Sequence, residues 1–212
     1  MKPISRRNFC QAALATGALL SAPGISLAAD SSKRKMTIDL RWGSIGVRAN
    51  QHQAIELAAK HGFESIEART GDLTRIPAGD RKKFLETLKE KGLVLSAAGF
   101  PVNLVGNESQ YQGGLKTLPE VLKLLREFGV TRVGTWIMPW HEKLTYRQSF
   151  KRYVKRLKEV GPILKDHNVR LGLEYIGTKH LWTRTRHSFV HTMAETKELL
   201  GEAGQSSVGF IL

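Results

Sequence analysis

A carboxylate that closes a short apolar run is the residue in this sequence best placed to do chemistry. Glu174 follows the run Leu171–Leu173, and Gly177 begins a loop soon after it. A carboxylate is costly to bury without a partner, and the carboxyl ends of parallel strands are where α/β folds place their catalytic groups. Glu174 is therefore a candidate catalytic residue. The alternative is that it is the first solvated residue after a strand.

A second glutamate closes an earlier apolar run of the same kind. Glu67 ends the run His61–Glu67 and would face the same edge of a parallel sheet as Glu174. One interpretation is that its carboxylate accepts a hydrogen bond from the substrate. The other is an ion pair with an arginine such as Arg41 or Arg69.

Aromatic and histidine side chains follow a further apolar run. Trp136, Trp140 and His141 lie in the segment 135–142. Aromatic rings at the end of a sheet either stack on the apolar face of a sugar or pack the loop on which they lie. We predict Trp136 and His141 as substrate-binding residues, with loop packing as the alternative, and we disfavour His141 as a metal ligand.

Three histidines lie in or after the loop that follows Glu174. His180 and His187 are on the loop itself, and we predict His180 as a further substrate contact, with a solvated loop histidine as the alternative. His187 and His191 have the i, i+4 spacing of a zinc pair. The segment between them lacks the glutamate of a His-Glu-x-x-His motif, so the sequence does not predict a zinc site there.

The elements that would position these residues form a repeat. Each unit has an amphipathic helix, a turn with Gly or Asn that ends the helix in the left-handed conformation, and a short apolar strand. Predicted strands begin near residues 36, 64, 94, 131, 170 and 207, with five helices between them. We place Pro119 in the first turn of the third helix and Ser188 at the N-cap of the fifth. Alternating units of this period predict a parallel sheet.

The number of units predicts the fold class. The composition, 41% hydrophobic and 25% charged, is that of a globular domain. Six strands and five helices in one domain over residues 36–212 fit part of an α/β fold, the (β/α)8 TIM barrel, which needs two more units and about 250 residues. A doubly wound sheet is the alternative. The chain ends in the apolar stretch 208–212, and an uncovered strand edge is unfavourable, so we expect the N-terminal part of a longer protein.

Residues 1–29 resemble an export signal. Ser5–Phe9 is a twin-arginine pattern, an apolar stretch too short to span a bilayer runs from Ala12 to Leu20, and small residues surround Ala28. We predict a twin-arginine signal peptide that is cleaved after Ala28, and a periplasmic or extracellular protein with no stable membrane anchor after cleavage. The only cysteine, Cys10, leaves with this segment, which excludes disulfides and cysteine-bound metals in the mature chain.

The order of the later segments resembles the xylose isomerase-like TIM-barrel superfamily, the sugar phosphate isomerase/epimerase group. The residues that carry this resemblance are Gly62–Glu67, Gly172–Glu174, Phe189–Met193 on the following helix, and Val208–Leu212 on the sixth strand. The resemblance implies that Glu174 ligates a divalent metal, Mn²⁺, Mg²⁺ or Zn²⁺, and that the substrate is a small carbohydrate. It also implies an aspartate of an Asp-x-x-His motif directly after the sixth strand, beyond Leu212.

The chemistry that the resemblance implies is isomerisation or epimerisation by proton transfer next to a sugar carbonyl. In the family, two glutamates act as acid and base while the metal polarises substrate oxygens. Only Glu174 of the two is present, and the later metal ligands also lie beyond the chain, so whether this chain is itself an active enzyme stays open. The family often keeps a glutamate at the position of Glu67, which favours a substrate contact for that residue.

Two other functions remain open. An endonuclease-IV-like phosphodiesterase would use the same barrel, and the net charge of +14, about +11 once the signal is removed, argues for it. That enzyme carries histidine ligands on early strands, which are missing at Glu67–Arg69 and Ala98–Pro101, and an exported protein has little access to DNA. We therefore predict no nucleic-acid partner. The remaining alternative is a barrel that binds sugar without converting it, and a homo-oligomer is left open.

The two strongly basic segments are interpreted as solvated faces of outer helices. They span residues 81–83 and 151–158, and a surface that contacts phosphate is the alternative. A phosphate-binding glycine loop of the Walker type does not occur in the sequence.

Overall fold

The computed structural model describes residues 36–211. The fold below is that of the compact unit that begins at Thr37. The predicted twin-arginine signal in residues 1–29 lies outside the described residues and stays a prediction. Within residues 36–211, no helix is both long enough and apolar enough to cross a membrane.

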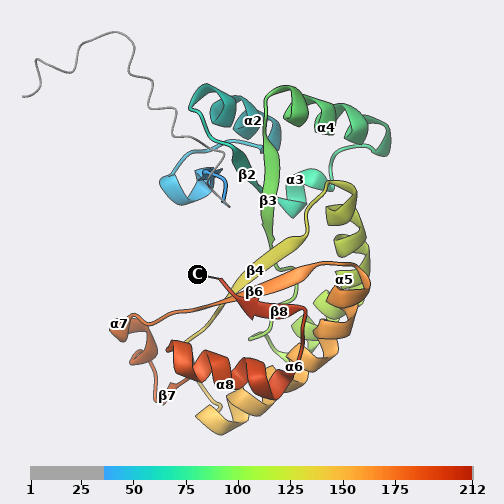
Figure 1. Ribbon diagram of the computed structural model, residues 1–212. Coiled ribbons are helices and arrows are strands. Elements are labelled where there is room, and N and C mark those ends of the chain that lie inside the picture. Colours follow the sequence, from blue (N-terminus) through green and yellow to red (C-terminus); the bar gives the residue numbers. More distant parts are fainter. Residues whose placement is uncertain (1–35, 212) are drawn as a thin grey trace, which may run out of the picture. The chain divides into compact units, whose positions relative to one another are not determined.

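The centre of this unit is a parallel sheet of six strands (Figure 1). The strands are β1 Asp39–Leu40, β2 Ser65–Ala68, β3 Val94–Gly99, β4 Arg132–Ile137, β6 Arg170–Tyr175 and β8 Val208–Phe210. They follow one another across the sheet in chain order, which is the arrangement of a (β/α) barrel. A doubly wound sheet would reverse its order at a central strand. The predicted strand positions and the α/β fold class are therefore confirmed.

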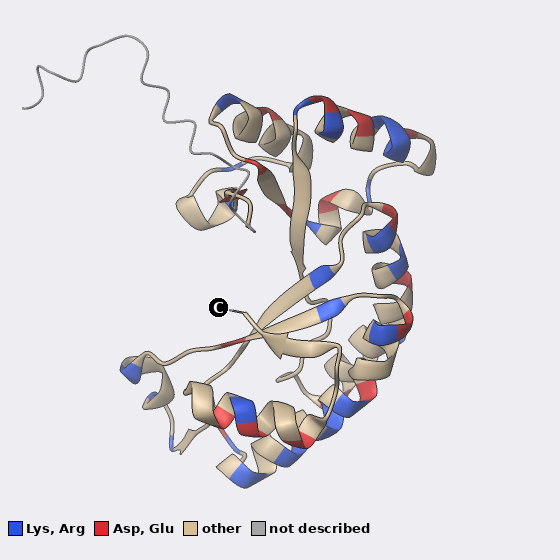
Figure 2. Ribbon diagram, viewed as in Figure 1, with Lys and Arg blue, Asp and Glu red and all other residues tan. Residues whose placement is uncertain are grey.

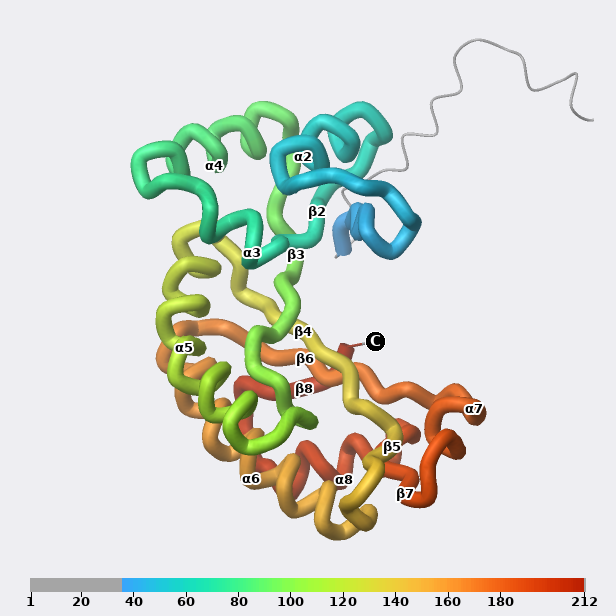
Figure 3. The backbone as a smooth tube through the Cα atoms, turned by 180° about the vertical axis from the view of Figure 1, so that it is seen from behind, coloured from blue at the N-terminus to red at the C-terminus, as the bar shows by residue number. Residues whose placement is uncertain are grey.

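Five long helices connect these strands and lie along one face of the sheet (Figures 1 and 3). They are α2 Gln51–Lys60, α4 Arg81–Glu90, α5 Glu108–Glu127, α6 Tyr146–Asp166 and α8 Met193–Ala203. The shorter helical turns are η2 Trp42–Ile45, α3 Thr70–Leu73, η3 Ala78–Asp80 and α7 Lys179–Trp182. Charged residues concentrate on the long helices, whereas the strands are mostly uncharged (Figure 2).

A left-handed residue follows each of the five long helices. At the end of α8 it is Gly204, with φ of 62°. The other four turn the chain back into the next strand, as the sequence predicts. Three of these residues are glycines, with φ of 72°, 66° and 77° at Gly62, Gly92 and Gly129, and the fourth is Asn168 with φ of 52°. In each unit the next amide donates to a carbonyl five residues earlier, which is the bond of a Schellman motif. These bonds are Phe63 to Ala58, Leu93 to Leu88, Val130 to Leu125 and Val169 to Leu164.

Four of the long helices begin with a capping box, in which the N-cap side chain and the third helical residue satisfy each other's backbone amides. The N-cap residues are Asn50, Asn107, Thr145 and Thr192. Two predicted boundaries are wrong for this reason. The fifth helix begins after Thr192, not after Ser188, because Glu195 completes the box with Thr192. The third begins after Asn107, so Pro119 lies inside α5 rather than in its first turn.

A small antiparallel ribbon, which the sequence did not predict, joins two loops. Its strands are β5 Trp140–His141, after β4, and β7 His187–Ser188, after β6. Each strand has two residues, too few to show a period of two in the sequence. The segment Phe189–Val190, expected on the fifth helix, is instead buried between β7 and that helix.

The two faces of the sheet differ in their side chains. Alternate residues of β4 and β6 are buried against the helices, among them Val133, Ile137, Leu171 and Leu173. The residues between them point the other way, because successive side chains of a strand alternate. We call this second side the open face. In β4 and β6 it consists of Arg132, Gly134, Trp136, Arg170, Gly172 and Glu174.

Candidate active site

Glu174 and Trp136 lie side by side on the open face, near the carboxyl ends of their strands. The register pairs Trp136 of β4 with Glu174 of β6. Both residues are exposed, and Trp136 is 60% exposed. Among residues 36–211, nothing forms a hydrogen bond or an ion pair with the Glu174 carboxylate. The structure therefore brings together two of the predicted site residues, a free carboxylate and an exposed indole ring.

The floor of the open face below this pair is made of glycines covered by one aliphatic side chain. Gly134 and Gly172 are partners in the register of β4 and β6. A Cβ atom at Gly172 would lie 2.5 Å from Cγ1 of Ile211, and one at Gly134 would lie 2.6 Å from its Cδ1. Ile211, which sequence analysis did not single out, thus packs onto the two glycines. Glycine pairing across strands is the signal that a large side chain comes close at this point.

Glu67 is engaged in ion pairs with both arginines that the sequence suggested as partners. Its Oε1 lies 2.9 Å from Nε of Arg69, and its Oε2 lies 3.3 Å from Nε of Arg41. The Arg69 guanidinium also stacks 4.2 Å above the Trp42 ring. The Glu67 side chain is only 17% exposed. The structure therefore contains the ion pairs that were the alternative for Glu67. The substrate contact predicted for Glu67 stays a prediction, and the substrate would have to bind a carboxylate that already pairs with two arginines.

His141 organises the turn between β5 and α6. Its Nδ1 accepts hydrogen bonds from the backbone amides of Lys143 and Leu144, at 3.0 and 2.9 Å. A nitrogen that accepts two hydrogen bonds carries no proton, so the neutral ring has its hydrogen on Nε2. Burial, followed by the Arg152 charge, lowers the pKa of His141. The predicted substrate-binding role of His141 is untested, and the structure gives it a role in holding the loop.

This role makes a pH dependence of stability testable. Because the folded-state pKa of His141 is lowered, the unfolded chain binds its proton first, and stability falls as pH drops below about 6.5, the ordinary value. We expect His141→Asn, which keeps an acceptor for the two amides, to reduce the loss of stability between pH 7.5 and pH 5. The measurement is urea unfolding of both proteins across this pH range.

A second variant separates the hydrogen bonds of His141 from its protonation. His141→Ala should be less stable than His141→Asn at every pH, since the Lys143 and Leu144 amides lose their acceptor. It should share the flatter pH profile. Parallel profiles for wild type and both variants would show that His141 does not titrate between the folded and unfolded states.

Two arginines of α6 hold the loop that follows β3. Arg156 donates to the carbonyls of Leu104 and Gly106, at 2.9 and 2.8 Å, and pairs with Glu108 at 3.0 Å. Arg152 donates to the carbonyls of Val105, at 2.8 Å, and of Gly106. Arg156 is only 2% exposed.

The interpretation of the segment 151–158 as a solvated face is therefore wrong for its two arginines. The sequence contained the signal for Arg156, since it falls on the helical stripe shared by Tyr153, Leu157 and Val160. Those three residues are all buried. Lys151, Lys155 and Lys158, by contrast, are exposed.

The remaining histidines do not gather with Glu174 into a metal site. His180 is exposed on α7. His187 opposes His141 in the ribbon. His191 stacks on Trp182 with ring centroids 4.7 Å apart, and its Nδ1 lies 3.4 Å from Glu195. Within residues 36–211, no group of three or more His, Cys, Asp or Glu side chains is arranged to hold a metal ion.

Comparison with known proteins gives a consistent result. An inosose isomerase from Bacillus velezensis is 24% identical over 168 residues, which cover 77% of this chain and 57% of that protein. A xylose isomerase domain protein from Alicyclobacillus acidocaldarius superposes with a TM-score of 0.67 at 24% identity, covering 77% of this chain and 58% of that one. The IOLI protein, solved with a zinc atom, superposes with a TM-score of 0.63 at 20% identity. The superposition covers 84% of this chain and 62% of the IOLI chain.

The chain spans a little over half the length of the curated inosose isomerase that it matches. The solved structures show the same fold as the six-stranded sheet with its outer helices. The family model described as Xylose isomerase-like TIM barrel matches residues 55–212. This range contains the strands from β2 onward and the long helices from α4 onward. The chain therefore belongs to the xylose isomerase-like TIM barrel family.

Proposed function

We propose that this protein is a sugar isomerase or epimerase that moves a proton on the carbon next to a carbonyl group, with Glu174 as the proton acceptor. The observation that carries the proposal is the pairing of the free Glu174 carboxylate with the exposed Trp136 ring on the open face. Membership of the family and the likeness to an inosose isomerase support this class of reaction.

Glu174 and Trp136 would have different roles in the reaction. A carboxylate within hydrogen-bonding reach of a C–H or O–H group acts as a general base, a role that contributes about 10² to 10⁴ in rate. The face of an indole ring packs against the apolar C–H face of a sugar ring. Trp136 would therefore orient the ring, and Glu174 would accept the proton and return it to the same or a neighbouring atom. Return by Glu174 to the neighbouring carbon, with the proton of the hydroxyl group moving to the carbonyl oxygen, gives an isomer. An epimer requires a second acid that delivers a proton to the opposite face of the same carbon.

A divalent metal fits the described residues only in part. Glu174 would supply one carboxylate oxygen, whereas protein sites for such ions use three or more ligands, or substrate oxygens in their place. No such group exists among residues 36–211. We therefore assign no step of the reaction to a metal, although the IOLI protein of the same fold was solved with zinc.

The test is hydrogen exchange at carbon. The protein is incubated in D₂O with a panel of keto sugars and inososes, with and without Mn²⁺, Mg²⁺ or Zn²⁺, and deuterium at the carbon next to the carbonyl is followed by NMR. We expect protein-dependent exchange on at least one member of the panel. Saturable sugar binding without exchange on any member would instead support the alternative of a barrel that binds sugar without converting it.

A further inference from the structure

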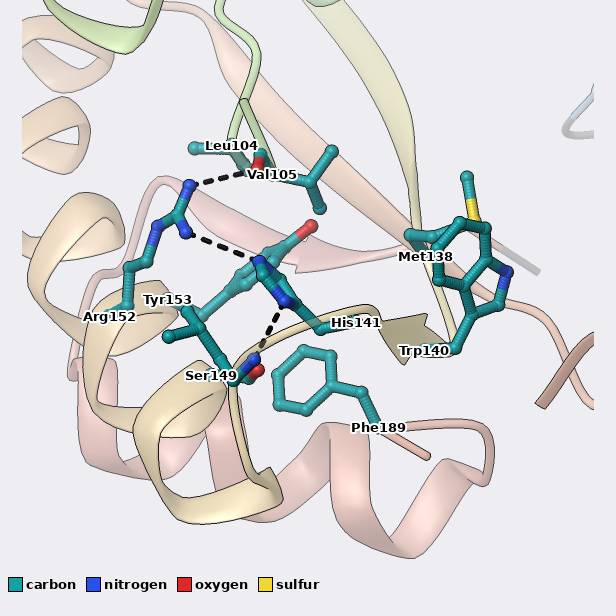
Figure 4. Close-up of a pocket in the computed structure, with 10 residues that line it drawn as sticks. Leu104, Val105, Met138, Trp140, His141, Ser149, Arg152, Tyr153 and Phe189 are labelled. Carbon is teal, nitrogen blue, oxygen red and sulfur yellow. Dashed lines mark hydrogen bonds between the residues drawn. The ribbon is translucent and has the colours of Figure 1, made fainter. Parts of the chain in front are cut away.

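A small cavity with a mostly apolar lining lies among α6, the ribbon and the loops that follow β3 and β4. It has a volume of about 10 Å³, room for one occupant the size of a water molecule (Figure 4). Its polar lining comes from α6 and the ribbon, namely His141, Ser149, Arg152 and Tyr153. Apolar residues, among them Leu104 and Phe189, close the rest.

Two hydroxyl groups of this lining are buried without a partner. Ser149 and Tyr153 are 4% and 3% exposed. Within the described part of the chain, neither the Ser149 Oγ nor the Tyr153 hydroxyl has a hydrogen-bond partner. Buried polar groups are almost always satisfied, and leaving one unsatisfied is costly. The Tyr153 ring packs against Phe189, with ring centroids 5.4 Å apart, so the hydroxyl cannot easily swing out to solvent.

A third mismatch lies between His141 and Arg152. The two amides that donate to Nδ1 of His141 leave the hydrogen on Nε2, so Nε2 is a donor. Nη1 of Arg152 lies 3.4 Å from this nitrogen and is also a donor. Figure 4 shows the Arg152 guanidinium directed at the imidazole ring. Two donors that face each other need an acceptor between or beside them.

The charge of the cavity is positive. Its lining contains no Asp or Glu. Among residues 36–211, no carboxylate forms a salt bridge with Arg152, whereas the neighbouring Arg156 is paired with Glu108. Burial, followed by the Arg156 charge, lowers the pKa of Arg152, and the charge of Glu108 offsets only part of this shift.

We propose that this cavity binds a single monoatomic anion, chloride in ordinary solution, held by Arg152, the Nε2–H of His141 and the Tyr153 hydroxyl. A halide accepts several hydrogen bonds at once and carries the charge that Arg152 lacks. It would tie α6 to the ribbon and to the loop after β3. Water, which fits the same volume, would satisfy the hydroxyl groups but leave the Arg152 charge unpaired.

The test uses bromide as a heavy substitute for chloride. Crystals of the protein grown or soaked in sodium bromide should show an anomalous peak between Arg152, His141 and Tyr153. In solution, thermal unfolding is measured in sodium chloride and in sodium gluconate at equal ionic strength, since gluconate is too large for the cavity. We expect chloride to raise the unfolding temperature in a saturable way.

A matched pair of tyrosine variants separates the site from a general salt effect. Tyr153→Phe keeps the ring and removes one donor, and it should weaken chloride binding by about tenfold or more. Tyr146→Phe, on the same helix and also against Phe189, should leave chloride binding unchanged. A water molecule without a bromide peak, or equal chloride effects in wild type and Tyr153→Phe, would overturn the proposal.

Discussion

Replacing Arg156 by methionine is expected to destabilise the fold by about 2 to 4 kcal/mol, because a buried carbonyl left without its donor costs about 1 to 3 kcal/mol and the contact of the guanidinium with an aromatic ring adds about 1 kcal/mol. Methionine fills a similar space but donates no hydrogen bond. The carbonyls of Leu104 and Gly106 would then stay buried without this donor. The stacking of the guanidinium 4.2 Å above the Tyr111 ring would be lost as well. The measurement is the midpoint and slope of urea unfolding.

Two control variants show whether the effect comes from the buried guanidinium. Arg156→Lys keeps the charge but not the planar fork, so it should fall between wild type and Arg156→Met. Lys155→Met removes a neighbouring charge whose side chain is 72% exposed, and it should change stability by less than about 0.5 kcal/mol. A midpoint for Arg156→Met equal to that of Lys155→Met would show that the arginine does not support the loop after β3.

Glu174→Gln is expected to slow carbon-bound hydrogen exchange by about 10² to 10⁴, the usual contribution of a general base. Glutamine keeps the shape and the hydrogen-bonding reach of glutamate but cannot accept the proton. Because Glu174 is exposed and no residue among 36–211 pairs with it, the stability of the fold should change by less than about 0.5 kcal/mol. The readout is the exchange rate on whichever sugar the wild type accepts.

Glu90→Gln provides the matched control for this experiment. It removes the same charge from the end of α4, on an outer helix, where the residue is also exposed. Its exchange rate should equal that of the wild type. If Glu174→Gln also exchanges at the wild-type rate, Glu174 is a solvated strand residue and another group performs the proton transfer.

Most parts of this fold that depend on neighbouring residues could be predicted from the sequence, whereas the starts of α5 and α8 were misplaced although their capping boxes are local. Strand positions and helix ends follow from contacts within five residues, such as the bond from Leu93 to Leu88 around the left-handed Gly92. The position of Glu174 near the end of a buried strand follows from the same local pattern. Its pairing with Trp136 then depends only on the adjacent strands being in parallel register.

The parts that depend on distant residues could not be predicted. The apolar stripe of α6 indicates that Arg156 is buried, but no local pattern specifies that it donates to the carbonyl of Leu104, 52 residues earlier in the chain. The pairing of β5 with β7 likewise brings Trp140 to Ser188. For Glu67, the sequence named both arginine partners but could not decide between them, and the structure uses both.

Most of the long helices have their own sequence signals for where they begin and where they end, and this affects which insertions the fold can accept during evolution. A capping box fixes where four of the long helices begin, and a left-handed residue fixes where all five of them end. The loops at the carboxyl ends of the strands lie outside these signals. Insertions there should leave each helix and strand in place, because the cost of a longer loop grows only slowly with its length. Natural variants of this chain should therefore differ most in length after β4 and β6, where new substrate contacts can be acquired without refolding the sheet.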